Sequence, residues 1–147
     1  MVDQSAIGHG FAPVHANVEP GRLRFFFSTL DEKNPVYRSP EAAGAAGFDA
    51  IPVPPTYLFC LEMMDAEDPF SFLKELKIDL ARILHGEQSF TYHAPVVVGD
   101  ALDFETTVTG VTDKKGGAMT IVDLATRITN QHGTHVADMV RTIVVRN

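Results

Sequence analysis

Cysteine is almost absent from this sequence, which has one cysteine and no tryptophan among its 147 residues. A single thiol cannot form a disulfide within the chain, so a fold stapled by internal disulfides is excluded. The one cysteine, Cys60, lies in the apolar run 57–61. We interpret it as a buried side chain that packs like a small hydrophobic residue, because a cysteine nucleophile needs a neighbouring base that the sequence does not place.

Positive charge and long apolar runs are also scarce. Twelve Lys and Arg residues against 19 Asp and Glu give a net charge of −7, and no basic run could neutralise a phosphate backbone. No segment approaches the roughly 20 apolar residues of a membrane-spanning helix, and the first 11 residues lack the pattern of a signal peptide. We therefore expect a cytoplasmic protein that has neither nucleic acid nor membrane as a partner.

The length and the hydrophobic content of 45% suit one globular domain, which we expect to span residues 1–147. The second half of the chain has the composition of β-strands, rich in Val, Ile, Thr and aromatic residues. Turn residues separate the segments, so consecutive strands are expected to return as hairpins in an antiparallel meander. The predicted strands are 89–93, 101–112, 118–129 and 135–145.

Alternation within two of these segments predicts one buried face of the sheet. In the first segment the alternating residues are Leu102, Phe104, Thr106 and Val108, and in the second they are Met119, Ile121, Asp123 and Ala125. Asp123 interrupts the second set. A buried carboxylate needs a partner, so Asp123 is expected to be paired, to lie at a dimer edge, or to face a pocket.

The segment 56–64 predicts a helix for the sheet to enclose. It follows Pro54 and Pro55, which a first helical turn tolerates, and it is apolar on nearly all sides. Before it we expect a strand at 11–18, a short helix at 23–30, for which a strand is the alternative, and a helix at 41–46; another helix is expected at 70–76.

These elements predict an α+β protein with the hot-dog fold, in which an antiparallel sheet wraps around a central helix and helical excursions precede it. A single copy leaves the sheet edges and a pocket incomplete, so pairing with a second chain is expected.

Two segments carry a resemblance to a known family. Residues 34–48 with 54–57, and residues 84–102 with their Pro95-Val-Val-Val-Gly-Asp100 motif, resemble the N-terminal, FAS1-like dehydratase domain of the MaoC family. The resemblance runs in consistent order from about Gly10 to Val145. It implies hydration or dehydration of acyl thioesters of CoA or acyl carrier protein, between trans-2-enoyl and (R)-3-hydroxyacyl forms, without a metal or an organic cofactor.

The catalytic motif of that family is altered in this chain. Removing water from a 3-hydroxyacyl thioester requires a base for the α-proton, an acid for the leaving hydroxyl and stabilisation of the thioester oxygen. Competent relatives supply the acid and base from an Asp-x-Asn-Pro-x-His motif. Alignment on Asn34 and Pro35 places Glu32 at the Asp position and Tyr37 at the His position.

Three hypotheses remain for this motif. Glu32 and Tyr37 form a working catalytic dyad, although an ordinary phenol titrates near 10 and is a poor base at neutral pH. Alternatively, Asn34 contacts substrate without chemistry, or Asn34 and Pro35 only fix a turn whose flanks are solvated.

The start of the predicted central helix is the candidate oxyanion site. In relatives a backbone N–H at this helix start faces the thioester carbonyl. Because the two preceding prolines lack N–H groups, Thr56 and Tyr57 offer the first donors, where the helix dipole favours negative charge. We therefore predict that Thr56 and Tyr57 contact substrate; otherwise Thr56 only begins the helix.

His85 and Glu87 form a second candidate site, just before the predicted strand 89–93. The segment His85-Gly-Glu-Gln88 resembles a motif in hydratases of branched dicarboxylic CoA thioesters. A His titrates near neutral pH, so His85 is a candidate catalytic residue and Glu87 a candidate substrate contact. His93, placed mid-strand, is interpreted as a hydrogen-bonded structural residue. The remaining histidines (His9, His15, His132 and His135) lack the spacing of a metal site, and none is expected.

The main hypothesis is a hydro-lyase subunit in one of two forms. In one, the chain binds substrate in a heterodimer whose MaoC-like partner carries the intact dyad; in the other, it is a homodimer active through His85, Glu32 or both. A hot-dog thioesterase that hydrolyses acyl-CoA and a non-catalytic acyl-CoA binding module are the alternatives.

Overall fold

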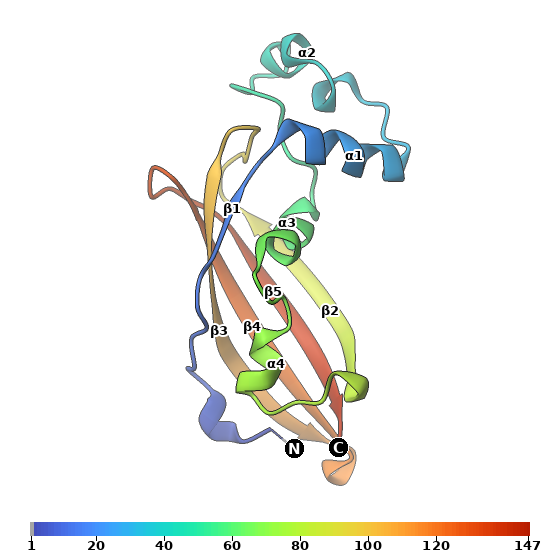
Figure 1. Ribbon diagram of the computed structural model, residues 1–147, viewed down its shortest axis with the longest axis vertical. Helices are drawn as coiled ribbons and strands as arrows, with labels where there is room; N and C mark the ends of the chain where they lie inside the picture. Colours follow the sequence, from blue (N-terminus) through green and yellow to red (C-terminus); the bar gives the residue numbers. More distant parts are fainter. Residues whose placement is uncertain (1) are drawn as a thin grey trace.

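The computed structural model describes residues 2–147, which form one antiparallel sheet of five strands in the order β1-β3-β4-β5-β2. The sheet curls around α3 (Tyr57–Asp65) and α4 (Ser71–Glu75), which lie on its concave side (Figure 1). The strands are β1 (Val14–Asn17), β2 (Ile83–Tyr92), β3 (Ala101–Lys114), β4 (Met119–Asn130) and β5 (His135–Arg146).

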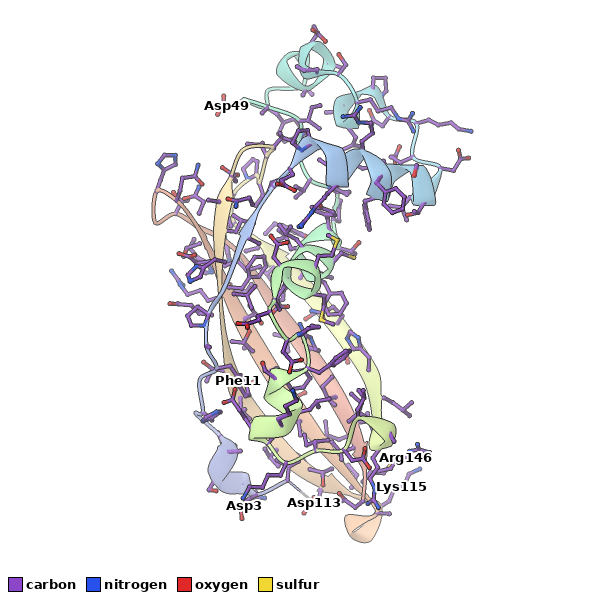
Figure 2. All side chains as sticks on the ribbon, viewed as in Figure 1. Asp3, Phe11, Asp49, Asp113, Lys115 and Arg146 are labelled. Carbon is purple, nitrogen blue, oxygen red and sulfur yellow. The ribbon has the colours of Figure 1, made fainter. Side chains whose placement is uncertain are left out.

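The remaining helices, α1 (Pro20–Leu30) and α2 (Pro40–Ala45), lie beyond one end of the sheet, while both termini lie at the other end (Figure 1). Asp3, Asp113 and Arg146 mark the terminal end in Figure 2. Each of these two helices begins at a proline, as a first turn allows.

Within residues 2–147, no helix has the length and apolar character needed to cross a membrane. The short 3₁₀ turns are η1 (Gln4–Ala6), η2 (Pro35–Tyr37), η3 (Leu80–Arg82) and η4 (Lys115–Gly117).

Apolar side chains of the concave face form two clusters. Around α3, Leu58 and Leu61 pack against Phe104, Ile128 and Met139, all of which are almost completely buried. Under α4 a second cluster joins Phe72 and Leu73 to residues of β3, β4 and β5. The sheet therefore encloses a central helix, as predicted from the sequence.

The strand order corrects one prediction. β3, β4 and β5 do return as hairpins, but β2 pairs with β5 at an edge of the sheet and not with β3. The reason lies in the connection after β2, which contains Pro95. Its residues 96–98 bond to the segment 51–53, with Val53 N–H donating to Val96 O (2.9 Å) and Val98 N–H to Ile51 O (2.8 Å). This pairing carries the chain across the end of the sheet.

The buried face of β4 is also different from the predicted one. The inward residues are Thr120, Val122, Leu124, Thr126 and Ile128, whereas the predicted set alternates with them and lies on the convex face. Apolar residues occupy both faces of β4, so its alternation was ambiguous.

Asp123 is one of the outward residues of β4. Its Oδ1 accepts a hydrogen bond from the Thr142 hydroxyl at 2.6 Å. Of the three possibilities raised for this carboxylate, the paired one is confirmed.

β2 begins at Ile83, six residues before the predicted start, so His85 and Glu87 lie inside a strand and not before one. The pairing with β5 shifts between these two residues, and Gly86 is the extra residue. A Cβ atom at Gly86 would lie 3.0 Å from Val144 Cγ2 and 3.3 Å from Thr142 O. Glycine is therefore required by close packing at this bulge.

The central helix is buried on one side only, which corrects the expectation that protein surrounds it. Tyr57, Leu58 and Leu61 are fully buried, but the side of α3 that bears Met64 is open, and Met64 is 49% exposed. The apolar residues on that side have no cover from the rest of residues 2–147.

A substitution at the bulge tests this account of β2. We expect Gly86→Ala to lower the free energy of unfolding by about 1–3 kcal/mol, because the added methyl group overpacks against β5. Urea denaturation measures the change. Gly44→Ala is the matched control: it lies in α2 with nothing within 4 Å of an added Cβ, and there alanine should stabilise by about 0.5–1 kcal/mol. Equal effects at the two glycines would contradict the close contact.

Candidate functional site

The Asn34–Pro35 loop uses its polar side chains to bind its own backbone. Asn34 Oδ1 accepts the Val36 N–H at 3.1 Å and so caps η2, and Glu32 Oε1 accepts the Asn34 N–H at 2.7 Å. The Arg38 guanidinium donates to the backbone carbonyl of Glu32. Both Glu32 and Asn34 are thus engaged in shaping the turn, and no base lies beside the Glu32 carboxylate in this set of contacts.

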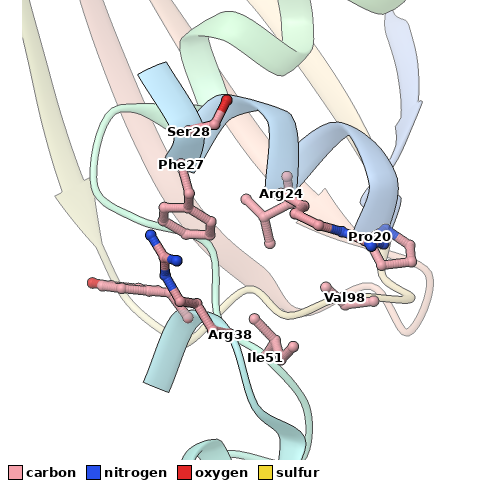
Figure 3. Close-up of a pocket in the computed structure, with 9 residues that line it drawn as sticks. Pro20, Arg24, Phe27, Ser28, Arg38, Ile51 and Val98 are labelled. Carbon is pink, nitrogen blue, oxygen red and sulfur yellow. The ribbon is translucent and has the colours of Figure 1, made fainter. Parts of the chain in front are cut away.

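Tyr37, at the position of the family's histidine, packs as an aromatic residue. Its ring centroid lies 4.8 Å from that of Phe27 in α1, with 32° between the ring planes. Tyr37 is half-buried and lines a hollow of about 360 Å³ between α1 and the loop (Figure 3). Its other walls are mostly apolar, with Arg24 and Arg38 as the two cations. Such a hollow suits an apolar group that carries an anion. The lining residues are Pro20, Leu23, Arg24, Phe27, Ser28, Tyr37, Arg38, Ile51 and Val98.

The first N–H groups of α3 are both occupied. Thr56 has a left-handed backbone (φ 77°), and its N–H donates to the Tyr92 hydroxyl oxygen at 3.0 Å. The Tyr57 N–H donates to Pro54 O at 3.2 Å. The helix start therefore presents the Tyr92 phenol, at the end of β2, where the sequence led us to expect a free backbone donor.

A second hollow, of about 430 Å³, lies between Tyr37 and the residues that precede α3. Tyr92 lines it with Pro55. Because the Tyr92 oxygen accepts from Thr56, its own proton remains available to a ligand in the hollow. Burial raises the pKa of Tyr92, which keeps the phenol protonated. The full lining is Val36, Tyr37, Phe48, Pro52, Val53, Pro55, Tyr92, His93, Ala94, Pro95 and Val96.

Sequence reasoning missed Tyr92. The signal was its spacing from Phe90, which faces inward. Residues two apart in a strand point to the same face, so Tyr92 is expected on the concave side.

Tyr57 is a core residue within this chain. Its side chain is fully buried, and its ring meets the edge of Phe26 at 5.0 Å between centroids. Its hydroxyl is buried without a hydrogen-bond partner among residues 2–147, and burial raises its pKa. Tyr57 is not among the residues that line the hollow containing Tyr92.

His85 and Glu87 point to opposite faces of the sheet. His85 is cross-strand partner to the inward Ile143, and its ring lies 5.3 Å from that of Phe59 in α3. Beyond the bulge, Glu87 is opposite Thr142 on the convex face. Both side chains are exposed, and neither lines the hollows around Tyr37. The structure therefore does not bring His85 and Glu87 together.

An apolar groove of about 450 Å³ runs between α1 and the open side of α3. Phe25, 73% exposed, and Met64 form part of it. Cys60 also lines it; burial raises the pKa of this half-buried thiol and favours its neutral form, in keeping with a hydrophobic role. The lining residues are Gly21, Arg22, Phe25, Phe26, Thr29, Cys60 and Met64.

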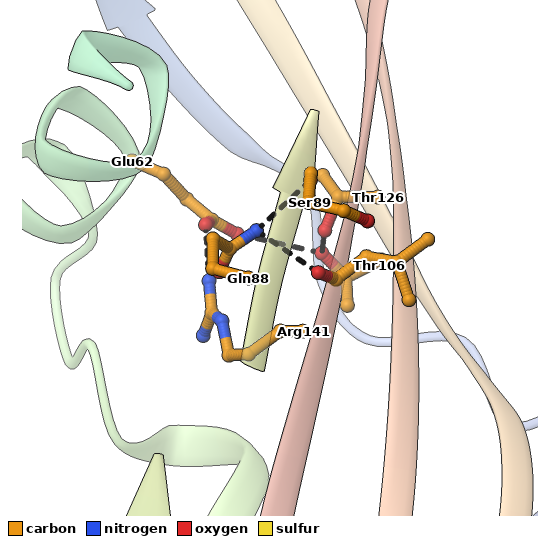
Figure 4. Close-up of polar contacts among 7 residues, drawn as sticks. Glu62, Gln88, Ser89, Thr106, Thr126 and Arg141 are labelled. Atoms are coloured by element: carbon orange, nitrogen blue, oxygen red, sulfur yellow. Dashed lines mark hydrogen bonds and ion pairs between the residues drawn. The ribbon is translucent and has the colours of Figure 1, made fainter. Parts of the chain in front are cut away.

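A buried ion pair fixes α3 to the sheet, and the sequence analysis missed it. Arg141 Nη2 of β5 donates to Glu62 Oε2 at 2.5 Å (Figure 4). The guanidinium lies 4.8 Å from the Phe59 ring centroid. The Thr106 hydroxyl lies 3.4 Å from Glu62 Oε1 and 2.8 Å from that of Thr126. Both charged side chains are 9% exposed. Burial raises the pKa of Glu62, against the opposing effect of Arg141. The signal was Glu62, a carboxylate in the otherwise apolar run 57–64.

Removing Arg141 should leave the buried Glu62 carboxylate without its partner and destabilise the fold. We expect Arg141→Met to lower the free energy of unfolding by about 3–5 kcal/mol at pH 8, because it leaves the Glu62 carboxylate unpaired. Burial raises the folded-state pKa of Glu62, and loss of the guanidinium that opposes this effect raises it further, so the loss of stability should shrink as the pH falls through the pKa of Glu62 in the variant. The double variant Glu62→Met/Arg141→Met should lose much less than Arg141→Met. Denaturation at pH 8 and pH 5 measures both effects; a pH-independent loss would contradict them.

Comparisons with known proteins agree with this fold. Residues 5–139 match the family described as FAS1-like, dehydratase domain region. A UPF0336 protein of Streptomyces avermitilis is 32% identical over 99% of this chain and 95% of its own length.

Solved structures are also similar to the chain, among them the following two. One is the HadBC (3R-hydroxyacyl-ACP dehydratase) complex from Mycobacterium tuberculosis, with a TM-score of 0.82 and 25% identity over 95% of this chain and 96% of that one. The (R)-hydratase from A. caviae involved in PHA biosynthesis shares the fold, with a TM-score of 0.69 and 23% identity over 93% and 94% of the two chains. The chain therefore belongs to the FAS1-like dehydratase domain family and has the hot-dog fold of the MaoC-like dehydratases.

Proposed function

We propose that this chain is the substrate-binding subunit of a hydro-lyase that interconverts trans-2-enoyl and (R)-3-hydroxyacyl thioesters of CoA or acyl carrier protein. A MaoC-like partner chain supplies the catalytic Asp and His. The observation that carries the proposal is the position of Tyr37: where the family motif has its histidine, this chain has a phenol ring packed on Phe27.

The rest of the altered motif supports the same division of roles. A general base must reach the proton that it removes. Glu32 instead accepts a hydrogen bond from the N–H of Asn34 within its own loop. The loop keeps the turn that Asn34 and Pro35 define, but it lacks a histidine. The acid and base must then come from elsewhere, and a second chain of the same fold is the source that we propose.

The groove between α1 and α3 supplies what a substrate-binding subunit needs. It is almost entirely apolar, and Phe25, Phe26, Cys60 and Met64 can line an acyl chain. It is open on one side, so a second chain is required to close it. The same chain would cover the free edge of β2, which pairs only with β5 within residues 2–147. Unpaired strand edges favour association of this kind.

The thioester carbonyl has a hydrogen-bond donor in the Tyr92 hydroxyl. Thr56 N–H orients the Tyr92 oxygen at 3.0 Å, and the phenol proton is left for a ligand in the hollow beside Tyr37. In this proposal Thr56 acts through Tyr92, and Tyr57 supports the groove from beneath α1. Asn34 shapes the loop whose Val36 and Tyr37 line the hollow.

Reconstitution tests the proposal. The purified chain alone should leave the absorbance of crotonyl-CoA and longer enoyl-CoAs unchanged, and activity should appear when a MaoC-like chain with the intact Asp-x-Asn-Pro-x-His motif is added. Hydration by the lone chain would overturn the proposal in favour of an active homodimer through His85 or Glu32. Release of free thiol would indicate a thioesterase, and acyl-CoA binding without turnover in any combination would indicate a binding module.

Charge placed in the groove should weaken the reconstituted enzyme. We expect Phe25→Asp to lower kcat/KM for a long-chain enoyl thioester by about ten- to a hundredfold, since a buried aromatic contact contributes about 1.5–3 kcal/mol. Ile7→Asp is the matched control, because Ile7 is 50% exposed but lies in the N-terminal segment, away from the groove. Size-exclusion chromatography separates loss of the partner from loss of substrate affinity. Equal activity of the two variants would contradict the assignment of the groove.

A further inference from the structure

Two histidines and an aspartate converge where β2 ends and β5 begins. His93 Nε2 lies 2.7 Å from Asp138 Oδ2, and His135 Nε2 lies 2.8 Å from Asp138 Oδ1. The two imidazole rings are 4.3 Å apart between centroids, and the three ligand atoms lie within 4.8 Å of one another. His93 was predicted to be hydrogen-bonded, which is confirmed, but it follows β2 and is not in mid-strand.

The fold brings these three residues together through an irregularity in β5. In a regular strand, residues three apart point to opposite faces. Here Ala137 pairs with Ile128 and His135 with Thr129, so Val136 is an extra residue, and His135 and Asp138 reach the same side. The His93 N–H donates to Val136 O at 2.9 Å, which fixes the first histidine beside the other two residues.

We propose that His93, His135 and Asp138 form a binding site for a divalent transition-metal ion of the Zn²⁺ type. Two imidazole nitrogens and one carboxylate are a donor set that zinc and cobalt prefer, and three protein ligands leave a fourth position for water. The three side chains are between 27% and 40% exposed, so an ion can enter from solvent. His93 also lines the hollow that contains Tyr92, so the two sites are neighbours, but the metal site does not rest on the proposed function.

Binding requires small rearrangements. Ligand atoms around tetrahedral zinc are separated by about 3.3 Å, given metal–ligand bonds of about 2.0 Å. The two contacts to Asp138 therefore open by roughly half an ångström, and the wider separation in the set, which is within 4.8 Å, closes by up to about 1.5 Å. Rotation of exposed side chains is enough for this change, because no buried group has to move.

Arg127 opposes the ion. Its Nη1 lies 3.1 Å from His135 Nδ1, and a guanidinium only donates, so Nδ1 accepts and Nε2 carries the proton in the metal-free protein. A neutral imidazole that binds an ion through Nε2 carries its proton on Nδ1, so the proton moves to Nδ1, and the exposed Arg127 side chain must turn away because both groups would then donate. Its positive charge lowers the affinity for the cation. Removing Arg127 should therefore strengthen ion binding. No such effect is expected if the His–Asp–His cluster has only a structural role.

Titration with the metal alone tests the site. Tag-free protein, treated with a chelator and dialysed, should bind one Zn²⁺ per chain in calorimetry with a dissociation constant on the order of 1 μM. Co²⁺ should give the visible absorption of a four-coordinate site. His135→Ala and Asp138→Asn should each weaken binding by at least about tenfold, since even the loss of an outer-shell partner has an effect of that size. Arg127→Gln should tighten it severalfold.

The matched control is His15→Ala. His15 forms a similar exposed pair with Asp103, at 2.5 Å, but it has no second histidine beside it, so this variant should bind Zn²⁺ unchanged. Circular dichroism confirms that each variant is folded. The proposal is overturned if the wild type binds Zn²⁺ no more tightly than about 1 mM, if both ligand variants bind as the wild type does, or if Arg127→Gln weakens binding.

Discussion

The packing of one face of α3 into the concave side of the sheet fixes the position of the other candidate residues. Leu58 and Leu61 hold the helix against the apolar cluster of β3, β4 and β5. Glu62 lies on the same face, where an unpaired carboxylate would be strongly unfavourable, and Arg141 satisfies it from β5. The ion pair fixes the orientation of α3 about its own axis. In this orientation Met64 lies on the open side.

The open side of α3 is suited to contact with a second chain. Exposed aromatic and aliphatic side chains gather there, with Phe25 of α1 above the helix and His85 of β2 beside Phe59. Contiguous apolar surface of this kind is typical of an interface and not of solvent-facing surface. The free edge of β2 borders the same side, so one partner chain can close both. His85 would then be enclosed by the partner.

Sequence patterns identified the elements more reliably than their arrangement. Turn residues separate β3, β4 and β5, so the bounds of these strands could be predicted to within two residues of the observed ones. The start of β2 was missed because the polar segment around Gly86 forms a bulge and lacks strand-like alternation. The strand order depends on hydrogen bonds between residues 51–53 and 96–98, which no local pattern encodes. Glu62 and Arg141 are 79 positions apart, so their pairing follows only from the fold.

The Asn34 loop forms its turn without a histidine at position 37. Asn34 caps η2 through its own side chain, and Pro35 fixes the first residue of that turn, so neither contribution depends on the residue at position 37. A phenol at position 37 adds an aromatic contact with Phe27 that strengthens the packing of α1 on the loop. The loop therefore remains well defined without a histidine. In the proposed heterodimer, this loop would shape the substrate pocket while the partner performs the proton transfers.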